Sequence, residues 1–487
     1  MVRTDILIIG GTIITMDPER RVIENGAVAI EGDQILSVGT TERLTKEYTG
    51  ERVIDASRKV VMPGLIDGHA HAGHSLVKTM GAGDSEKWVD VCRVTYKEGT
   101  TESFWYADAA LGSLERLKFG TTCGVTFLGG GESYMRTDDP VFGERHCEAV
   151  EKTGTREFLI VGPGDPPYPD RFAHWNDGAR TDVMVSFEDQ LATCETLIRR
   201  WHRQANGRIN IGIMFPVHRP RRNPLGPSEL QDLKERSRAT RELSRKHDVL
   251  FSQDGHSRGT VKFAHEQLGT LGPDALLSHA TELTAEEIAI CRTTDTKIVH
   301  NPSAMMSMMG RCPVPELLDA GVTVMLGSDG VAPDRSHDMF RHMFQCTRYH
   351  RRHFRDPSYL PAGKVLEMVT IDAARALGLE SEIGSLEPGK KADIILIDMF
   401  KPHIYPLNMP VHRIAYFANG SDVDTVIVDG RILMEGRTVR TVDEAEVLEA
   451  AQEETVKMID RTGQCHTLET PKEFWGHTRL PFQRPPW

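Results

Sequence analysis

Two histidines separated by one residue follow a short apolar segment of the chain. The apolar segment covers residues 61–66, and the histidines are His69 and His71. Alternate residues of an extended chain point to the same face, so both imidazoles project together. Two imidazoles side by side at the end of a buried strand are well suited to bind one divalent metal ion. The alternative is a polar turn that holds two histidines by coincidence.

Polar side chains able to do chemistry also follow four later apolar segments. They are Gln253 and His256, then His279, then His300 with Asn301, and finally Asp329. A lone histidine at the end of a strand is usually structural. Histidines after several strands, with an aspartate after another, favour one convergent metal centre if those strands lie parallel in one sheet.

The apolar segments alternate with longer amphipathic ones, which predicts a parallel β-sheet covered by helices. The expected strands cover residues 122–127, 157–161, 209–215, 249–253, 275–279, 297–300 and 322–326, with helices at 228–247 and 284–292. This alternation fits an open doubly wound sheet or a closed barrel. Short β-type segments fill the first sixty residues and return near residues 393–431, so we expect both ends to build one small β domain.

Composition excludes several classes of protein. The 487 residues carry a net charge of −12, which argues against a general binder of nucleic acid or anionic membranes. The eight cysteines include no C-x-x-C pair, as expected for reduced thiols in the cytoplasm. No apolar run approaches the ~20 residues that cross a bilayer. We therefore expect a cytoplasmic enzyme that acts on a small molecule.

Five segments together resemble the amidohydrolase superfamily, in the branch that holds cytosine and guanine deaminases, methylthioadenosine deaminases and triazine hydrolases. They are residues 63–71, 276–279, 300–303, 327–330 and 383–393. The resemblance implies an α/β fold, a distorted (β/α)8 TIM barrel with a small β-sandwich domain built from both chain ends. We expect the boundaries 1–62 and 383–440 for the sandwich and 63–382 for the barrel, and the amphipathic pattern at 444–459 indicates that 441–487 forms a C-terminal helix and extended tail. Members of this kind commonly form homo-oligomers.

The resemblance also implies roles for the strand-end residues. His69, His71 and Asp329 would bind one divalent metal ion, and Asp329 would also take a proton from the attacking water. His279 would polarise the substrate or that water. Zinc is favoured, while iron, cobalt and manganese accept the same ligands. No lysine follows the 209–215 strand, which argues against a second, bridged metal.

This chain departs from the branch after the strand at 249–253. Other members have His-x-x-Glu there, where the histidine binds metal and the glutamate moves a proton to a ring nitrogen; the matching positions here are Gln253 and His256. Three residues remain open as the additional ligand: Gln253, His256 or His279. A histidine general acid at position 256 would suit a departing amine better than a ring nitrogen.

We therefore expect hydrolysis of a non-peptide C–N bond in an amide, urea or carbamate-like compound. In its departure from the usual metal motif, the chain also resembles the phenylurea and thiocarbamate hydrolases of this branch. The alternative is an aminohydrolase (deaminase) of an aminated heterocycle such as a pyrimidine or triazine. A second alternative is a metal-free binding protein on the same fold.

The substrate pocket is expected to include residues from the loops after the strands. These are His300, Asn301, Met305, Met309 and Trp88. Methionines suit an apolar or aromatic ligand, although core filling explains them equally well. We expect His74 in a surface loop.

Overall fold

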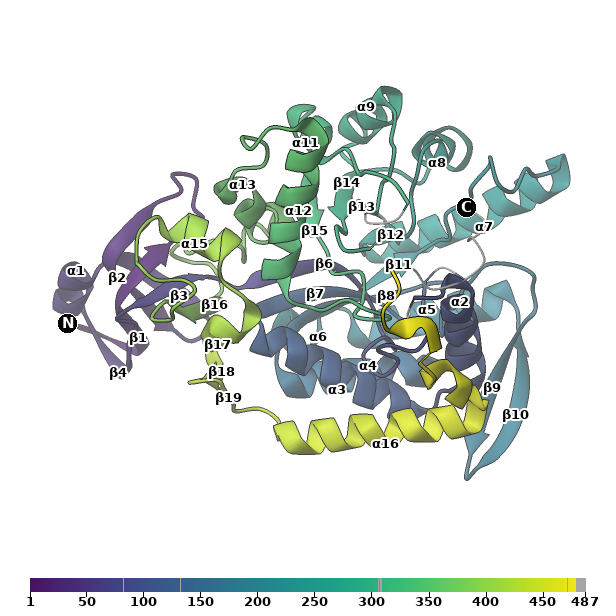
Figure 1. Cartoon of the computed structure of the whole chain (residues 1–487), viewed down its shortest axis with the longest axis horizontal. Coiled ribbons are helices and arrows are strands. Elements are labelled where there is room, and N and C mark those ends of the chain that lie inside the picture. The colour runs from purple at the N-terminus through teal and green to yellow at the C-terminus, as the bar shows by residue number, and fades with distance from the viewer. Residues whose placement is uncertain (82, 132, 305, 307–308, 471, 479–487) are drawn as a thin grey trace.

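The computed structural model describes residues 1–81, 83–131, 133–304, 306, 309–470 and 472–478. It contains two large β-sheets and a two-stranded hairpin, with helices packed around one of the sheets (Figure 1). One large sheet belongs to the middle of the chain, and the other is built from its two ends.

The central sheet has eight parallel strands in the order β15-β14-β13-β12-β11-β8-β7-β6. The strands are β6 (Leu65–His71), β7 (Thr121–Phe127), β8 (Arg156–Val161), β11 (Ile209–Met214), β12 (Phe251–Gln253), β13 (Ala275–Ser278), β14 (Lys297–His300) and β15 (Val324–Leu326). Every residue of these strands is buried, as expected of a parallel sheet covered on both faces. The predicted α/β barrel is confirmed.

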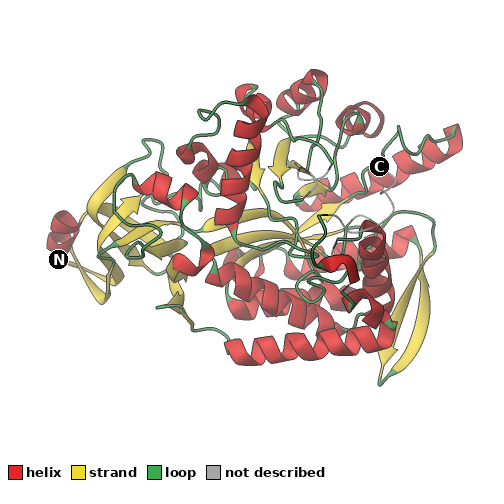
Figure 2. Cartoon of the chain, in the orientation of Figure 1, coloured by secondary structure: helices red, strands yellow, loops and turns green. Residues whose placement is uncertain are grey.

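Helices follow the strands and cover the outside of the barrel (Figure 2). They include α2 (Ser85–Val94), α3 (Glu102–Lys118), α4 (Pro140–Thr153), α5 (Phe187–Trp201), α6 (Gln204–Gly207), α7 (Pro227–His247), α8 (Thr260–Phe263), α9 (Ala285–Thr293), α11 (Val314–Asp319), α12 (Met339–Phe354), α13 (Ala362–Glu367) and α14 (Ile371–Ala376). Local sequence sets several starts: Ser186 and Thr284 each form a reciprocal capping box, at the beginning of α5 and α9.

The barrel is distorted at the seam between β6 and β15, the two ends of the strand order. There the main-chain N–H groups of Ile66 and Leu326 donate to the carbonyl groups of Val369 and Met368, so another part of the chain occupies the seam. Nearer the carboxyl ends, the Ser328 N–H donates to the Asp67 carboxylate at 2.8 Å. The seam is therefore closed by side-chain and loop contacts.

The second sheet has nine strands. They are β1 (Val2–Ile14), β2 (Val22–Glu31), β3 (Gln34–Thr40), β4 (Tyr48–Asp55) and β5 (Lys59–Pro63) from the first part of the chain, and β16 (Ile394–Asp398), β17 (Val423–Val428), β18 (Arg431–Glu435) and β19 (Thr438–Val439) from the last. Antiparallel pairing of β5 with β16 joins the two ends. The prediction that both ends build one β domain is confirmed. Two helices, α1 (Thr41–Glu47) and α15 (Pro410–Tyr416), lie within these segments.

Two further elements pack on the barrel helices. Helix α16 (Glu444–Thr462) runs along α3 (Figure 1), in agreement with the helix expected after residue 440. The hairpin of β9 (Asp170–Asn176) and β10 (Ala179–Val185) was not predicted, because β10 is largely exposed and both strands carry charged residues. Among the described residues, no helix is long and apolar enough to span a membrane.

Candidate metal centre

Five side chains from four strand ends converge at the carboxyl rim of the barrel. His69 and His71 belong to β6, Asp254 and His279 directly follow β12 and β13, and Asp329 is the third residue after β15. All five are buried. His279 and Asp329 have positive φ angles of 66° and 59°, so the backbone turns sharply where each strand ends. Such costly conformations cluster at functional sites.

The two carboxylates lie among the three imidazoles. Asp254 Oδ1 is 3.3 Å from His69 Nε2 and 3.1 Å from His279 Nε2, and its Oδ2 is 3.5 Å from His71 Nε2. Asp329 Oδ1 is 3.4 Å from His69 Nε2 and 3.2 Å from His71 Nε2. Two overlapping groups result, His69–Asp254–His279 and His69–His71–Asp329, each with its ligand atoms within 4.8 Å of one another.

This donor set fits a divalent cation. His69 Nε2 is buried and has no hydrogen-bond partner among the described residues. Ligand atoms about 2.1 Å from one ion lie roughly 3 to 3.5 Å apart, which matches the separations between the imidazole nitrogens and the carboxylates. Burial disfavours a charged imidazole, yet Asp254 and Asp329 raise the pKa of His69 to about 10. The paired carboxylates therefore attract positive charge to this point, as a metal ion would supply.

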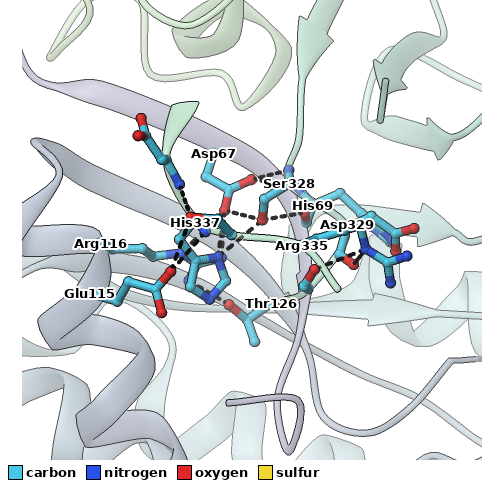
Figure 3. Close-up of polar contacts among 12 residues, drawn as sticks. Asp67, His69, Glu115, Arg116, Thr126, Ser328, Asp329, Arg335 and His337 are labelled. Atoms are coloured by element: carbon cyan, nitrogen blue, oxygen red, sulfur yellow. Dashed lines mark hydrogen bonds and ion pairs between the residues drawn. The ribbon is translucent and has the colours of Figure 1, made fainter. Parts of the chain in front are cut away.

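Surrounding groups orient these ligands. His71 Nδ1 lies 3.0 Å from the Gly129 carbonyl oxygen, so an N–H there leaves Nε2 free as a ligand. Figure 3 shows buried Asp67 linking the ends of β6 and β15: its carboxylate accepts from the Ser328 hydroxyl at 2.7 Å and pairs with Arg116 at 3.0 Å. Despite burial, Arg116 helps hold the Asp67 pKa well below its usual range. The Asp329 N–H donates to the His69 carbonyl at 2.8 Å, which sets the two ligands side by side.

Gln253, one of the expected metal ligands, does not join the group. Its amide nitrogen donates to the Phe215 carbonyl oxygen at 3.2 Å, and its amide oxygen accepts from the Thr270 hydroxyl at 3.3 Å. The next residue, Asp254, is in the group instead. Consecutive residues at a strand end point in different directions. The residue that points into the group is Asp254, one position after the expected Gln253, so the ligand is a carboxylate and not an amide.

His256 does not have the properties expected of a general acid. The ring is fully buried, its Nδ1 is 2.9 Å from the Thr260 hydroxyl, and its Nε2 has no partner among the described residues. Burial, with the nearby Arg219 guanidinium, lowers the pKa of His256 to about 3. The imidazole is therefore neutral near pH 7, when a general acid must carry a proton.

The expected substrate-binding residues lie in different surroundings. Asn301 Nδ2 is 3.4 Å from His279 Nδ1, next to the centre, whereas the fully buried ring of His300 packs against His350 of α12. Met309 lines a cavity of about 470 Å³ with Ser257 and Thr281, which closely follow Asp254 and His279. Met305 lies outside the described residues.

The prediction that His74 lies in a surface loop is wrong. His74 is buried, with its ring 4.8 Å from that of His71 and 5.1 Å from the indole of Trp88 in α2. Neither ring nitrogen has a hydrogen-bond partner among the described residues. His74 lies three residues past the end of β6, and no local sequence pattern signals its burial. The signal for Asp254 was stronger, since a carboxylate is a better ligand than the adjacent amide.

Comparison with known proteins adds independent evidence. The model of the amidohydrolase family matches residues 60–223 and 243–433. The chain is 32% identical over 469 residues to a 5-methylthioadenosine/S-adenosylhomocysteine deaminase of Syntrophobacter fumaroxidans, which covers 94% of this chain and 98% of that protein. It is 32% identical over 468 residues to a 5'-deoxyadenosine deaminase of Methanosarcina mazei, with 94% and 99% covered.

Two solved structures show the same fold. A zinc-bound adenosine deaminase from Xanthomonas campestris superimposes with a TM-score of 0.80 at 21% identity, covering 94% of this chain and 99% of that one. A zinc complex of the atrazine chlorohydrolase TrzN from Arthrobacter aurescens gives 0.74 at 22% identity, covering 92% and 100%. With the barrel, the convergent strand-end ligands and the family match all in agreement, the chain belongs to the amidohydrolase family, as a hydrolase of carbon–nitrogen bonds other than peptide bonds.

Proposed function

We propose that this protein is a metal-dependent deaminase that releases ammonia from the adenine ring of a nucleoside. The relatives named as 5'-deoxyadenosine and 5-methylthioadenosine/S-adenosylhomocysteine deaminases carry this proposal, because they align over 94% of the chain at 32% identity. They favour the deaminase alternative over the amide, urea or carbamate hydrolysis expected from the sequence. The proposed substrate is thus a small purine nucleoside with a modified 5' position.

The residues at the barrel rim would hold one divalent ion, with zinc favoured. His69, His71, Asp254 and Asp329 supply the ligand atoms, and His279 lies against both carboxylates. Such an ion, when bound, lowers the pKa of a water molecule from about 15.7 to about 7. This allows attack on the ring carbon that carries the amino group.

Side chains of the protein would transfer the protons and orient the attacking water. Asp329 accepts the proton from the attacking water and returns it to the departing amino group, which leaves as ammonia. His279, held by Asn301 at 3.4 Å through its other ring nitrogen, orients the attacking oxygen. The products are ammonia and the corresponding ring carbonyl, so one water is consumed for each C–N bond broken.

Protonation of the ring nitrogen is the step at which this chain differs from the branch pattern. If Asp254 takes the place of the branch histidine, the position three residues later is Ser257, where the branch has glutamate. Serine is a much weaker acid than glutamate. This observation supports a second candidate function, hydrolysis of an amide, urea or carbamate-like bond, in which the departing amine takes the proton and no ring nitrogen needs one.

The test is a paired assay on protein reconstituted with zinc, manganese or cobalt. Under the proposal, 5'-deoxyadenosine or 5-methylthioadenosine yields ammonia and a 6-oxopurine in equal amounts. The Asp329→Asn variant should lose activity by about 10² to 10⁴-fold, the usual contribution of a general base. No ammonia from either nucleoside would overturn the proposal. Amine release from a panel of ureas, carbamates and amides would then establish the second candidate, and failure to bind metal would favour the metal-free binding protein.

A further inference from the structure

A second cluster of metal-ligating side chains lies in the core, apart from the centre at the barrel rim. His300 ends β14, and Cys346 and His350 lie one turn apart on α12. All three are buried, and one ligand atom from each lies within 4.8 Å of the other two. The cluster shares no residue with the centre formed by His69, His71, Asp254, His279 and Asp329.

His300 has ligand capacity that nothing else uses. Its side chain is 0% exposed, and neither ring nitrogen has a hydrogen-bond partner among the described residues. Leaving a buried polar group without a partner costs about 1 to 3 kcal/mol. A neutral imidazole with a free ring nitrogen is the form in which histidine binds metals.

Both ring nitrogens of His350 face carbonyl oxygens, an arrangement that a cation would stabilise. Its Nδ1 lies 2.9 Å from the Cys346 carbonyl oxygen, and its Nε2 lies 3.0 Å from the Cys312 carbonyl oxygen. Both oxygens can only accept, while a neutral imidazole has a single N–H. If Nδ1–H donates to Cys346, the lone pair of Nε2 faces a second lone pair on Cys312. A metal ion beside Nε2 removes this conflict, and a ring N–H donated to a backbone carbonyl is common in metal-bound histidines.

Cys346 supplies the sulfur ligand. It is a free, fully buried cysteine. A coordinating metal ion deprotonates a thiol that would otherwise stay neutral. Thiolate and imidazole together select zinc and similar ions over magnesium or calcium.

We propose that His300, Cys346 and His350 form a second, structural metal site for zinc or a similar ion, with the Cys312 carbonyl oxygen as an additional ligand. Nitrogen and sulfur ligands of tetrahedral zinc lie about 3.4 to 3.7 Å apart, so side-chain adjustments on the order of 1 Å close the site. The ion ties the end of β14 to α12. Because Asn301 directly follows His300 and contacts His279, the same ion steadies one wall of the rim centre.

Cobalt titration of the metal-free full-length protein tests this site independently of any enzymatic activity. Thiolate-bound Co²⁺ gives a strong near-ultraviolet charge-transfer band, and the rim centre contains no cysteine. The wild type should bind two Co²⁺ per chain and develop this band. Cys346→Ser should lose the band and one Co²⁺, whereas Asp254→Asn should lose the other Co²⁺ and retain the band.

Cys291→Ser is the matched control, since Cys291 is equally buried but lies in α9 outside the cluster. It should keep both ions and the band. One Co²⁺ per chain without a thiolate band in the wild type would overturn the proposal, whether or not the variants fold. So would a band that persists unchanged in Cys346→Ser.

Discussion

Asp254 determines the charge of the rim centre. Directly after β12 this chain brings a carboxylate to the centre, so Asp254 and Asp329 place two negative groups against the three histidines. Two carboxylates balance the charge of one divalent ion. The same two carboxylates raise the pKa of His69 despite its burial, so that a proton supplies the positive charge when no metal ion is bound.

Replacing Asp254 with asparagine should weaken binding of the rim metal by at least about 100-fold, because the change removes a charged ligand and retains its shape. Substituting a group that only orients a metal ligand lowers metal affinity 10- to 100-fold, and the loss of a ligand itself should exceed this. Binding is measured by competition with a chelating dye. Gln253→Met is the control and should change the affinity less than about 3-fold. A larger loss in Gln253→Met than in Asp254→Asn would return the ligand role to Gln253.

The buried His342 should make the protein less stable in acid. Its Nε2 donates to the Ser336 carbonyl oxygen at 2.7 Å and its Nδ1 lies 3.2 Å from the Ser303 hydroxyl, which suits a neutral ring. Burial lowers its pKa. Below the unfolded-state pKa of about 6.5, the unfolded chain therefore binds a proton that the folded chain does not, and stability falls as the pH falls.

The measurement is the free energy of unfolding of wild type and His342→Gln between pH 7 and 5. The wild type should lose up to about 1.4 kcal/mol more than the variant for each pH unit below about 6.5. The exposed His412→Gln serves as control, and its difference from wild type should stay constant. A constant difference for His342→Gln as well would show that this ring takes up a proton in the folded state.

At the scale of elements, helix α16 covers the side of the barrel near the rim. One face of the helix is buried, including Ala451 and Met458, and the other face is exposed. Met458 approaches Thr95 and Gly99, which belong to the segment between α2 and α3. Helix α2 carries Trp88 beside His74. The C-terminal helix thus supports the wall of the candidate site from outside.

Met458→Ala should lower the free energy of unfolding by about 2 to 5 kcal/mol, the usual cost of truncating a fully buried methionine. Leu448 lies on the same helix with 51% of its surface exposed. Leu448→Ala should therefore stay within about 0.5 kcal/mol of wild type. Chemical denaturation followed by circular dichroism compares the two. Equal losses would mean that α16 does not dock on the barrel in solution.

At the scale of the whole molecule, a cluster of buried ion pairs connects the barrel to the β domain. Arg156 begins β8, and its Nε donates to Asp393 at 2.6 Å, while its guanidinium also pairs with Asp429. These aspartates lie at the ends of β16 and β17 in the other sheet. The domain boundaries at residues 1–62, 63–382 and 383–440 stay a prediction. The homo-oligomer stays a prediction, which light scattering on the purified protein would check.

Arg156→Met should destabilise the protein by about 3 to 5 kcal/mol, because it leaves buried carboxylates without their main partner. Arg52 forms a more exposed ion pair with Glu435 inside the β domain. Arg52→Met should therefore cost less than about 1 kcal/mol. Differential scanning calorimetry would report both values. Similar small losses for the two variants would indicate that the cluster does not hold the domains together.

Local sequence was sufficient to predict most of the fold. Each expected barrel strand is present. The helices expected at 228–247 and 284–292 match α7 (Pro227–His247) and α9 (Ala285–Thr293) to within one residue at each end, since apolar periodicity and capping residues act over a few neighbours. The hairpin β9–β10, in which β10 is largely exposed, lacked such a pattern. The positions of His69, His71, His279 and Asp329 at strand ends were likewise evident from the sequence.

The sequence by itself determined the family, the barrel and the kind of residue at each strand end, because these follow from local patterns and characteristic segments. Only the tertiary structure decided which of Gln253, Asp254 and His256 faces the rim centre, because side-chain direction at a strand end depends on how the chain leaves the strand. Burial likewise decided the protonation of His256, and packing of β14 against α12 assembled the second cluster. These properties arise from the surroundings that distant segments create, which no local pattern encodes.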